Sequence, residues 1–411
     1  MSLWLTYFRP RMLQMLLLGF SSGLPLALTG TTLQAWYTVS GLSVVAIGFL
    51  ALVGQPYTYK FFWAPLMDRF IPPFLGRRRG WMLILQLALL IAIASMAAFD
   101  PHVRPTTLAL LALIVAFLSA SQDICLDAYR ADILSTEERG TGSAMWIAGY
   151  RIAMLVSGGV ALIMAEYIGW HETFLIMALL MLIGVVTTLC SPSPANDQAR
   201  PLSLGAAISE PLQDFLKRPY LFAILLFIIL YKMGDAFAVS LSTTFYLRGL
   251  GFSLAEVGAM MKTMTLIATL LGLFIGGSLM LRLGMYRALM LFGILQGVTN
   301  LFSVWLALVG KSFLLLAVTI FAENVTGGMG NAAFLAFLMA LCNVRYTATQ
   351  LALLSALMAV GRVFIGPFAG LLVEHVGWAE FFVWSFIAAL PGLFLLRWLK
   401  HKINFEAERI I

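Results

Sequence analysis

Ionisable side chains stand inside otherwise apolar stretches of this sequence, and these are the residues best suited to chemistry. The set is Lys60, Asp123, Asp127, Arg151, Lys232, Asp235, Lys262, Glu323 and Arg362. A charge at membrane depth costs at least about 2.5–3.5 kcal/mol, so it normally faces a partner or a water-filled cavity. These residues therefore predict a membrane protein with a polar interior, where acids carry protons and cations hold an anionic solute.

The acids of this set are the candidates for proton coupling. They are Asp123, Asp127, Asp235 and Glu323. Asp123 and Asp127 stand one helical turn apart on a shared helix face, where repulsion between like charges favours keeping a proton on one of them. We expect Asp123 to be the main proton carrier. For Asp127 the alternative is an ion pair with Arg130 near the cytoplasmic boundary.

The cations of the set are the candidates for binding an anionic solute. They are Arg151, Lys232, Lys262 and Arg362. At ~1.5 Å per residue along each helix, Asp123 reaches the level of Arg151, and Asp235 reaches that of Lys262. Each pair either locks two helices together, or lets an incoming anion take the cation so that the acid is free to bind a proton.

Uncharged polar and aromatic residues in or beside the same stretches are weaker candidates for contacts with a transported solute. They are Gln34, Gln122, Asn324, Tyr150 and Tyr231. The amides could bond hydroxyl groups of a solute and the rings could stack on its flat faces. Hydrogen bonding between helices explains the amides equally well.

The composition indicates that membrane-spanning helices position these residues. The chain has 61% hydrophobic and only 11% charged residues, with a mean hydropathy of +0.94, whereas soluble domains carry about 25% charged residues. Its apolar runs are long and continuous, which favours membrane helices over a barrel. The expected spans are 12–36, 44–66, 81–99, 106–128, 142–166, 173–190, 220–246, 255–280, 288–309, 313–341, 349–374 and 380–398.

Charge at the ends of these spans predicts the topology. An even number of crossings places both termini on one side, and most of the flanking Lys and Arg residues fall on that side. The opposite loops hold only Arg104, Arg248 and Lys311. Cytoplasmic loops are the ones enriched in Lys and Arg, so we expect both termini in the cytoplasm. This distribution also explains the net charge of +7 without a nucleic-acid partner.

The sequence repeats itself at a shift of about 210 residues, which predicts two parallel halves. Gly48 aligns with Gly258, Arg151 with Arg362, and the string Ile84-Leu85-Gln86 with Ile294-Leu295-Gln296. The hydrophilic segment 191–219, rich in proline, is the expected linker. We therefore expect an all-α membrane protein of twelve helices, with six-helix bundles at 1–190 and 220–411 related by a pseudo-two-fold repeat.

Two resemblances narrow the function. The loop DRFIPPFLGRRRG (Asp68 to Gly80) resembles the cytoplasmic motif of the major facilitator superfamily, which implies gating roles for Asp68 and Arg77. The strings GLPLALTGTTLQAW (Gly23 to Trp36), SASQDICLDAYRADIL (Ser119 to Leu134) and ENVTGGMGNAAF (Glu323 to Phe334) resemble the AmpG family of muropeptide permeases. Gly23-Leu24-Pro25 predicts a kink, because proline removes a backbone hydrogen bond, and Pro25 is a candidate for a gate or for static shape.

The AmpG resemblance implies a specific activity. Members of that family import N-acetylglucosaminyl-1,6-anhydro-N-acetylmuramyl peptides across the bacterial inner membrane, driven by protons. This import feeds peptidoglycan recycling and can induce a β-lactamase, and therefore β-lactam resistance. The alternative cargo is another large anionic solute, such as acetyl-CoA or a siderophore conjugate.

Other classes of function are disfavoured. The sequence has no H-E-x-x-H, G-x-S-x-G or G-x-x-x-x-G-K-[ST] motif, and its four histidines are scattered, which argues against an enzyme and against ATP-driven transport. The absence of a repeated filter sequence argues against a channel. Its three cysteines give no disulfide framework. We expect no metal and no cofactor, and a monomer in the lipid bilayer whose partners are its solute and protons.

Overall fold

The computed structural model describes residues 10–134, 138–194, 216, 219–342, 347–403 and 405, and in this part of the chain all regular structure is helical. The chain divides into two compact units. Unit 1 comprises Met1–Leu42, Val53–Leu202 and Ser253–Ala259, and unit 2 comprises Ser43–Leu52, Ser203–Phe252 and Met260–Ile411. Most of the expected linker 191–219 lies outside the described residues, so the division at that segment remains a prediction.

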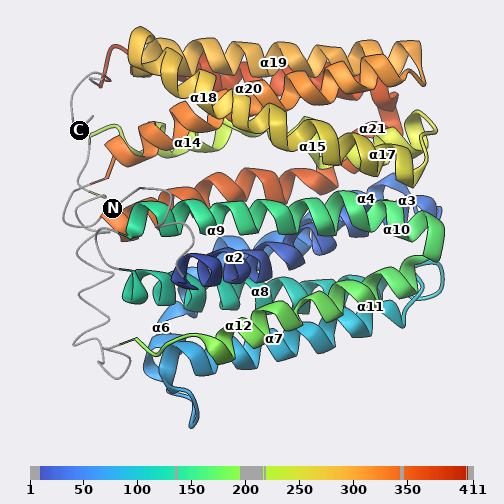
Figure 1. The fold of residues 1–411 in the computed structure, drawn as a ribbon. Helices are drawn as coiled ribbons and strands as arrows, with labels where there is room; N and C mark the ends of the chain where they lie inside the picture. Colours follow the sequence, from blue (N-terminus) through green and yellow to red (C-terminus); the bar gives the residue numbers. More distant parts are fainter. Residues whose placement is uncertain are drawn as a thin grey trace. The chain divides into compact units, whose positions relative to one another are not determined.

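Nine helical segments of the described chain are long and apolar enough to cross a membrane. They are Pro10–Val39, Gly76–Ala97 (α7), Pro105–Ile133 (α8), Thr141–Ile168, Trp170–Cys190, Leu221–Gly249, Met285–Val309 (α19), Phe313–Ala340 (α20) and Ala356–Leu399. The helices of each unit run roughly alongside one another (Figure 1). A shorter apolar helix, α18, spans Leu266–Leu283.

Several of the expected spans differ from the structure. The span 44–66 is not one helix but the short segments α4 (Val44–Phe49), η2 (Leu50–Gly54), α5 (Gln55–Tyr59), η3 (Lys60–Phe62) and α6 (Ala64–Arg69). Pro56 stands near the start of α5 and has no N–H to continue a helix. The spans 349–374 and 380–398 join as one element, α21 (Thr347–Leu399), with a bend at Gly377, where φ is 78°.

The first membrane helix bends at a place the sequence did not predict. Helix α2 (Pro10–Ala27) continues through Pro25, and the break lies at Gly30 (φ −104°, ψ −106°) within the π-helical segment η1 (Leu28–Thr32), before α3 (Leu33–Val39). Thr29 donates a 3.1 Å hydrogen bond to the carbonyl of Pro25. The kink expected at Pro25 is therefore displaced by about one turn, and π-bulges are a known cause of such bends.

Direct backbone contact joins α2 to α9 (Arg139–Met154) in unit 1. A Cβ added at Gly149 would lie 1.9 Å from the carbonyl oxygen of Leu16, and one at Gly19 would lie 2.3 Å from that of Trp146. Glycine is needed at both positions because no side chain fits between the two backbones. Membrane helices rely on such small-residue contacts because lipid provides no hydrophobic drive for association.

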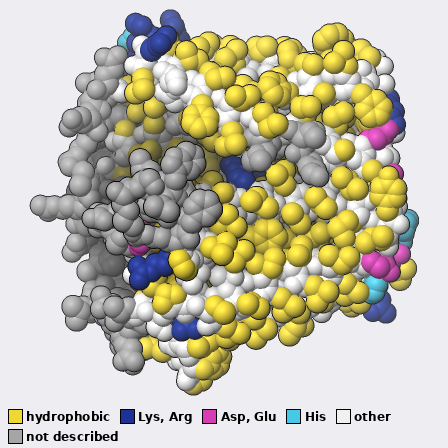
Figure 2. Space-filling model, in the orientation of Figure 1, with side chains coloured by type: hydrophobic (Ala, Val, Ile, Leu, Met, Phe, Trp, Pro, Cys, Tyr) yellow, Lys and Arg dark blue, Asp and Glu magenta, His cyan; other side chains and the backbone are white. Residues whose placement is uncertain are grey.

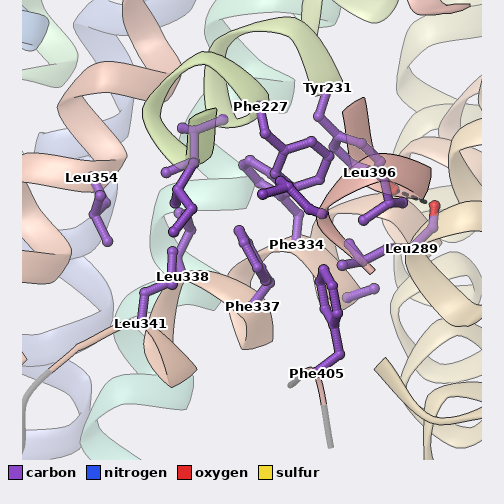
Figure 3. Packing of buried hydrophobic residues seen from close by; sticks show 14 of the residues in the cluster. Phe227, Tyr231, Leu289, Phe334, Phe337, Leu338, Leu341, Leu354, Leu396 and Phe405 are labelled. Carbon is purple, nitrogen blue, oxygen red and sulfur yellow. Dashed lines mark hydrogen bonds between the residues drawn. The ribbon is translucent and has the colours of Figure 1, made fainter. Parts of the chain in front are cut away.

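The core of unit 2 is an aromatic cluster near one end of its helices. Phe227 and Tyr231 of α14 (Leu221–Tyr231) pack against Phe334 and Phe337 of α20, with Leu396 of α21 beside them (Figure 3). The rings of Tyr231 and Phe334 stack with centroids 4.9 Å apart. This cluster fixes the end of α14, and therefore the residue that follows it, Lys232.

Each unit also contains a short helix from the other half of the sequence. In unit 1, α17 (Leu254–Met260) packs so closely that a Cβ at Gly258 would lie 2.5 Å from the carbonyl of Gly159. In unit 2, α4 packs on α21, where a Cβ at Gly48 would lie 2.4 Å from the carbonyl of Gly366. Gly48 and Gly258 are the pair that the sequence repeat aligns.

Apolar side chains cover much of the outer surface. Figure 2 shows them over the middle of the visible face, with charged side chains mainly toward its two ends. Phe222, Phe274 and Leu281 each expose most of their side chains. Soluble proteins rarely expose such continuous apolar surface, whereas a helix in lipid does so on every outward side.

Candidate functional site

The carboxylate of Asp123 lies between α2 and α8 in unit 1. Ser22 donates a 2.6 Å hydrogen bond to its Oδ1. The neighbouring pair repeats the arrangement, because Gln122 donates a 3.0 Å bond to the hydroxyl of Ser21. Two successive residues of α8 therefore bond two successive residues of α2, and Asp123 is bound by a neutral hydroxyl.

Asp123 has further polar groups near it but no ion pair with Arg151. The Lys60 ammonium and the buried Tyr57 hydroxyl interact with it electrostatically. Within the described residues no salt bridge joins Asp123 to Arg151, so the predicted pair is wrong. The reason is that α2 lies against α8 and supplies Ser22 as the partner.

Asp127 is separate from this interior cluster. Its side chain is 50% exposed and lies 3.1 Å from the Arg130 guanidinium. That guanidinium also lies over the ring of Trp146, 5.0 Å from its centroid. The ion pair that the sequence offered as the alternative for Asp127 is therefore present, and the structure gives this acid a partner at the end of α8.

Lys232 stands at a break between two helices of unit 2. Helix α14 ends at Tyr231 and α15 (Met233–Ser240) begins after Lys232, whose φ and ψ are −97° and 0°. Its ammonium lies 3.8 Å from Oδ2 of Asp235, which is longer than a hydrogen bond. The predicted partner of Asp235 was Lys262, whose side chain lies outside the described residues, so the ion pair that the structure describes for Asp235 is with Lys232.

Glu323 and Asn324 follow each other on α20 and differ in their surroundings. Ser303 of α19 donates a 3.0 Å bond to Oε1 of Glu323, so this acid, like Asp123, is bound by a serine. Asn324 accepts a 3.3 Å bond from Thr269 and donates a 2.7 Å bond to the carbonyl of Ile320. Its amide is therefore used in joining α20 to α18 and within its own helix.

The other candidate residues are dispersed. Tyr231 lies in the aromatic cluster and donates a 2.9 Å bond to the carbonyl of Leu289, so its side chain serves packing. Gln34 is buried on α3, Tyr150 and Arg151 are half-buried on α9, and Arg362 is exposed on α21. The structure thus brings together Asp123 with Gln122, and Lys232 with Asp235, but does not gather the full predicted set in either unit.

Arginines of the first turn of α7 join the helix ends of unit 1. Arg77 is buried, Arg78 pairs with Asp132 of α8 at 3.1 Å, and Arg79 donates to the carbonyls of Thr188 and Leu189 at 3.2 and 2.8 Å. Thr188 and Leu189 stand near the C-terminal end of α12 (Leu182–Cys190), where carbonyls lack helical partners. The side chain of Asp68, the other predicted gating residue, lies outside the described residues.

Sequence reasoning missed several polar residues of these clusters. Ser21, Ser22 and Ser303 carry no charge and were not singled out, although each stands in an apolar helix. Gln296 stood out only through the repeat, because the expected span 288–309 carries no charged side chain. It is buried, and its Nε2 has no hydrogen-bond partner among the described residues.

Comparisons with known proteins agree with this fold. Residues 15–349 match the family model described as Major Facilitator Superfamily. The anhydromuropeptide permease of Escherichia coli K12 is 51% identical over 398 residues, covering 97% of this chain and 81% of that protein. A Rickettsia conorii protein named putative transporter AmpG 4 is 35% identical, covering 96% of this chain and 97% of its own length.

Solved transporters share the fold at low sequence identity. The nucleoside transporter NupG superposes with a TM-score of 0.73 at 16% identity, covering 96% of this chain and 99% of that chain. A POT family transporter in complex with 5-aminolevulinic acid superposes with a TM-score of 0.75 at 11% identity, covering 95% and 96%. These likenesses concern the fold alone.

Proposed function

Because the chain belongs to the major facilitator superfamily and, within it, to the AmpG family of permeases, we propose that it imports anhydro-muropeptides from the periplasm to the cytoplasm with protons. The observation that carries this proposal is the 51% identity, over 97% of the chain, to a protein named anhydromuropeptide permease. The relatives and the fold are those of major facilitator transporters, which move solutes without covalent chemistry.

Two partly buried acids suit proton transfer for the same physical reason. Asp123 is bonded by Ser22 and Glu323 by Ser303. A hydroxyl can donate to a carboxylate and can also accept from a carboxylic acid, so either protonation state keeps its partner. An acid paired only with a cation would lose that pairing on protonation. We therefore assign proton coupling to Asp123 and Glu323, with Asp235 released for a proton when its cation is taken.

We assign the binding of the cargo's anionic peptide to the cations. Lys232 is the strongest candidate, because its ammonium is buried and its ion pair within the described residues is a long contact with Asp235. Arg151, Lys262 and Arg362 complete the proposed set. Gln122 and Gln34 remain candidates for sugar hydroxyls, whereas the bonds that Asn324 and Tyr231 make favour a packing role for both.

Twelve crossings fit the described helices. The bent α21 would supply two crossings, and the broken segment 44–69 and the short α18 would supply one each. Together with the other long apolar helices they make up the twelve. We propose six-helix halves at 1–190 and 220–411 joined by 191–219, with both termini in the cytoplasm, in the inner membrane and as a monomer. Motion of the halves would involve Asp68, Arg77 and the bend that follows Pro25.

Transport in vesicles tests this proposal. The purified protein is placed in proteoliposomes, and uptake of labelled anhydro-muropeptide is measured with and without an inward proton gradient. We expect accumulation that needs the gradient and disappears with a protonophore, and no competition from acetyl-CoA or a siderophore conjugate. Uptake of either of those solutes without uptake of muropeptide would overturn the proposed cargo.

A further inference from the structure

Two buried nitrogen donors in unit 2 have no hydrogen-bond acceptor in the described part of the chain. The ammonium of Lys232 and the amide nitrogen of Gln296 lack a hydrogen-bond partner among the described residues. Lys232 is 8% exposed and Gln296 is 5% exposed. Buried donors are nearly always satisfied, and an ammonium offers three N–H bonds. Both donors are therefore available to a group that is not part of the chain.

The two donors face the same stretch of α20. A Cβ added at Gly330 would lie 3.0 Å from Oε1 of Gln296 and 3.8 Å from Nζ of Lys232, and one at Gly327 would lie 3.8 Å from Nε2 of Gln296. Gly327 and Gly330 are three residues apart, so they share one helix face. Oxygen and nitrogen of an amide are assigned from such surroundings, and in either orientation Gln296 faces these glycines.

The glycines of this stretch have different neighbours. A Cβ at Gly328 would lie 2.6 Å from the carbonyl of Thr269 on α18, so Gly328 serves the close packing of two helices. Gly327 and Gly330 have no backbone neighbour of that kind in the described chain. Their effect is to keep side-chain volume away from the Gln296 amide and the Lys232 ammonium.

We infer that Lys232, Gln296 and Gly330 form an anion subsite that receives a carboxylate of the transported solute. This inference rests on the proposed function. It adds Gln296 and Gly330 to the residues that bind the cargo, and it names a carboxylate as the group that they receive. A carboxylate offers two oxygens, one for the ammonium and one for the amide N–H, and bonds to ionised groups are the stronger ones. Asp235 already offsets part of the Lys232 charge, which favours a singly charged group.

The sequence repeat supplies a matched control. Gln86 of α7 aligns with Gln296 and is also buried. Its amide oxygen accepts a 2.8 Å bond from Thr188 of α12, so it joins two helices of unit 1. Replacing Gln86 and Gln296 by Leu makes the same chemical change at equivalent positions, and only the second change touches the proposed subsite.

Transport of paired cargoes tests the subsite. The pair is an anhydro-muropeptide and its analogue with every peptide carboxyl converted to a carboxamide. For wild type we expect a KM about tenfold lower for the acid, as expected for a charge-assisted hydrogen bond. Gln296→Leu and Gly330→Ala should bring the two KM values together, whereas Gln86→Leu should leave their ratio unchanged. Equal KM values in wild type, or an unchanged ratio in Gln296→Leu, would overturn the inference.

A binding measurement separates this inference from the proposed cargo. The full-length protein in detergent is heated with N-acetyl-alanyl-glutamate or with its diamide, and the unfolding temperature is recorded. We expect the acid alone to raise the unfolding temperature of wild type and of Gln86→Leu, but not that of Gln296→Leu or Gly330→Ala. The same small shift in all four proteins would exclude the subsite even if muropeptide is transported. If the unfolding temperatures shift as expected but muropeptide is not transported, the result would support the subsite and contradict the proposed cargo.

Discussion

The hydroxyl of Ser22 lies 2.6 Å from Oδ1 of Asp123, and this hydrogen bond joins α2 to α8 in the interior of unit 1. One turn further along α8, Asp127 is half exposed and paired with Arg130 at 3.1 Å. The two acids have the same chemistry and stand on the same helix face, but one has a neutral partner and the other a cation. This contrast makes them a natural pair of test positions.

Asp123→Asn is expected to abolish accumulation driven by protons, because asparagine cannot gain or lose a proton. Uptake under an inward gradient should fall to the level of protein-free vesicles, while exchange of cargo without a gradient should persist. Asp127→Asn should stay within about twofold of wild type, since an exposed ion pair contributes only about 0–1 kcal/mol. Full gradient-driven uptake by Asp123→Asn would remove this carboxyl from coupling.

Gly149→Ala is expected to destabilise unit 1, because the added Cβ would lie 1.9 Å from the carbonyl oxygen of Leu16. Overpacking of this kind costs about 1–3 kcal/mol, and the collision here is with backbone that cannot rotate away. The control is Gly277→Ala in α18, where a Cβ would meet nothing within 4 Å. Unfolding temperature in detergent is the measurement: it should fall for Gly149→Ala and stay level or rise for Gly277→Ala. Equal values for the two variants would contradict the close contact of α2 with α9.

The sequence predicted the general class of the fold and the chemistry of its interior. Long apolar runs indicate helices, although the single span expected at 44–66 is broken where Pro56 stands near the start of α5. The ion pair of Asp127 with Arg130 was also available from the sequence, because partners three residues apart on one helix need no tertiary information.

Contacts between helices could not be predicted in the same way. Asp123 was expected to meet Arg151 on the basis of depth, and it meets Ser22 instead. Depth follows from counting residues, but the rotation of each helix decides which neighbour a side chain faces. A helix that is apolar on every side carries little periodic signal for that rotation. For the same reason the sequence did not reveal that Gln296 faces Gly330.

Cys190 provides a test of topology without an engineered probe. It is exposed at the C-terminal end of α12, whereas Cys125 and Cys342 are buried. Because the loops with most Lys and Arg should be cytoplasmic, a membrane-impermeant maleimide should label Cys190 in inside-out vesicles and not in spheroplasts. The reverse should hold for His102→Cys in a Cys190→Ser background, since His102 is exposed in the turn before α8. Labelling of Cys190 from the periplasm would invert the proposed orientation.

The pair of Lys232 and Asp235 is expected to respond differently to single and double replacement. Lys232→Met removes a buried cation but leaves Asp235 facing its place, and breaking a buried pair usually costs about 3–5 kcal/mol. The cost should be smaller here, because the contact is long at 3.8 Å and Asp235 is only partly buried. Adding Asp235→Asn removes the uncompensated charge, so the double variant should unfold at a higher temperature than Lys232→Met alone. Transport should not recover together with stability. Both variants lack the ammonium that we propose holds the cargo carboxylate, so neither should regain a low KM for the acid cargo. Recovery of transport together with stability in the double variant would show that Lys232 only neutralises Asp235.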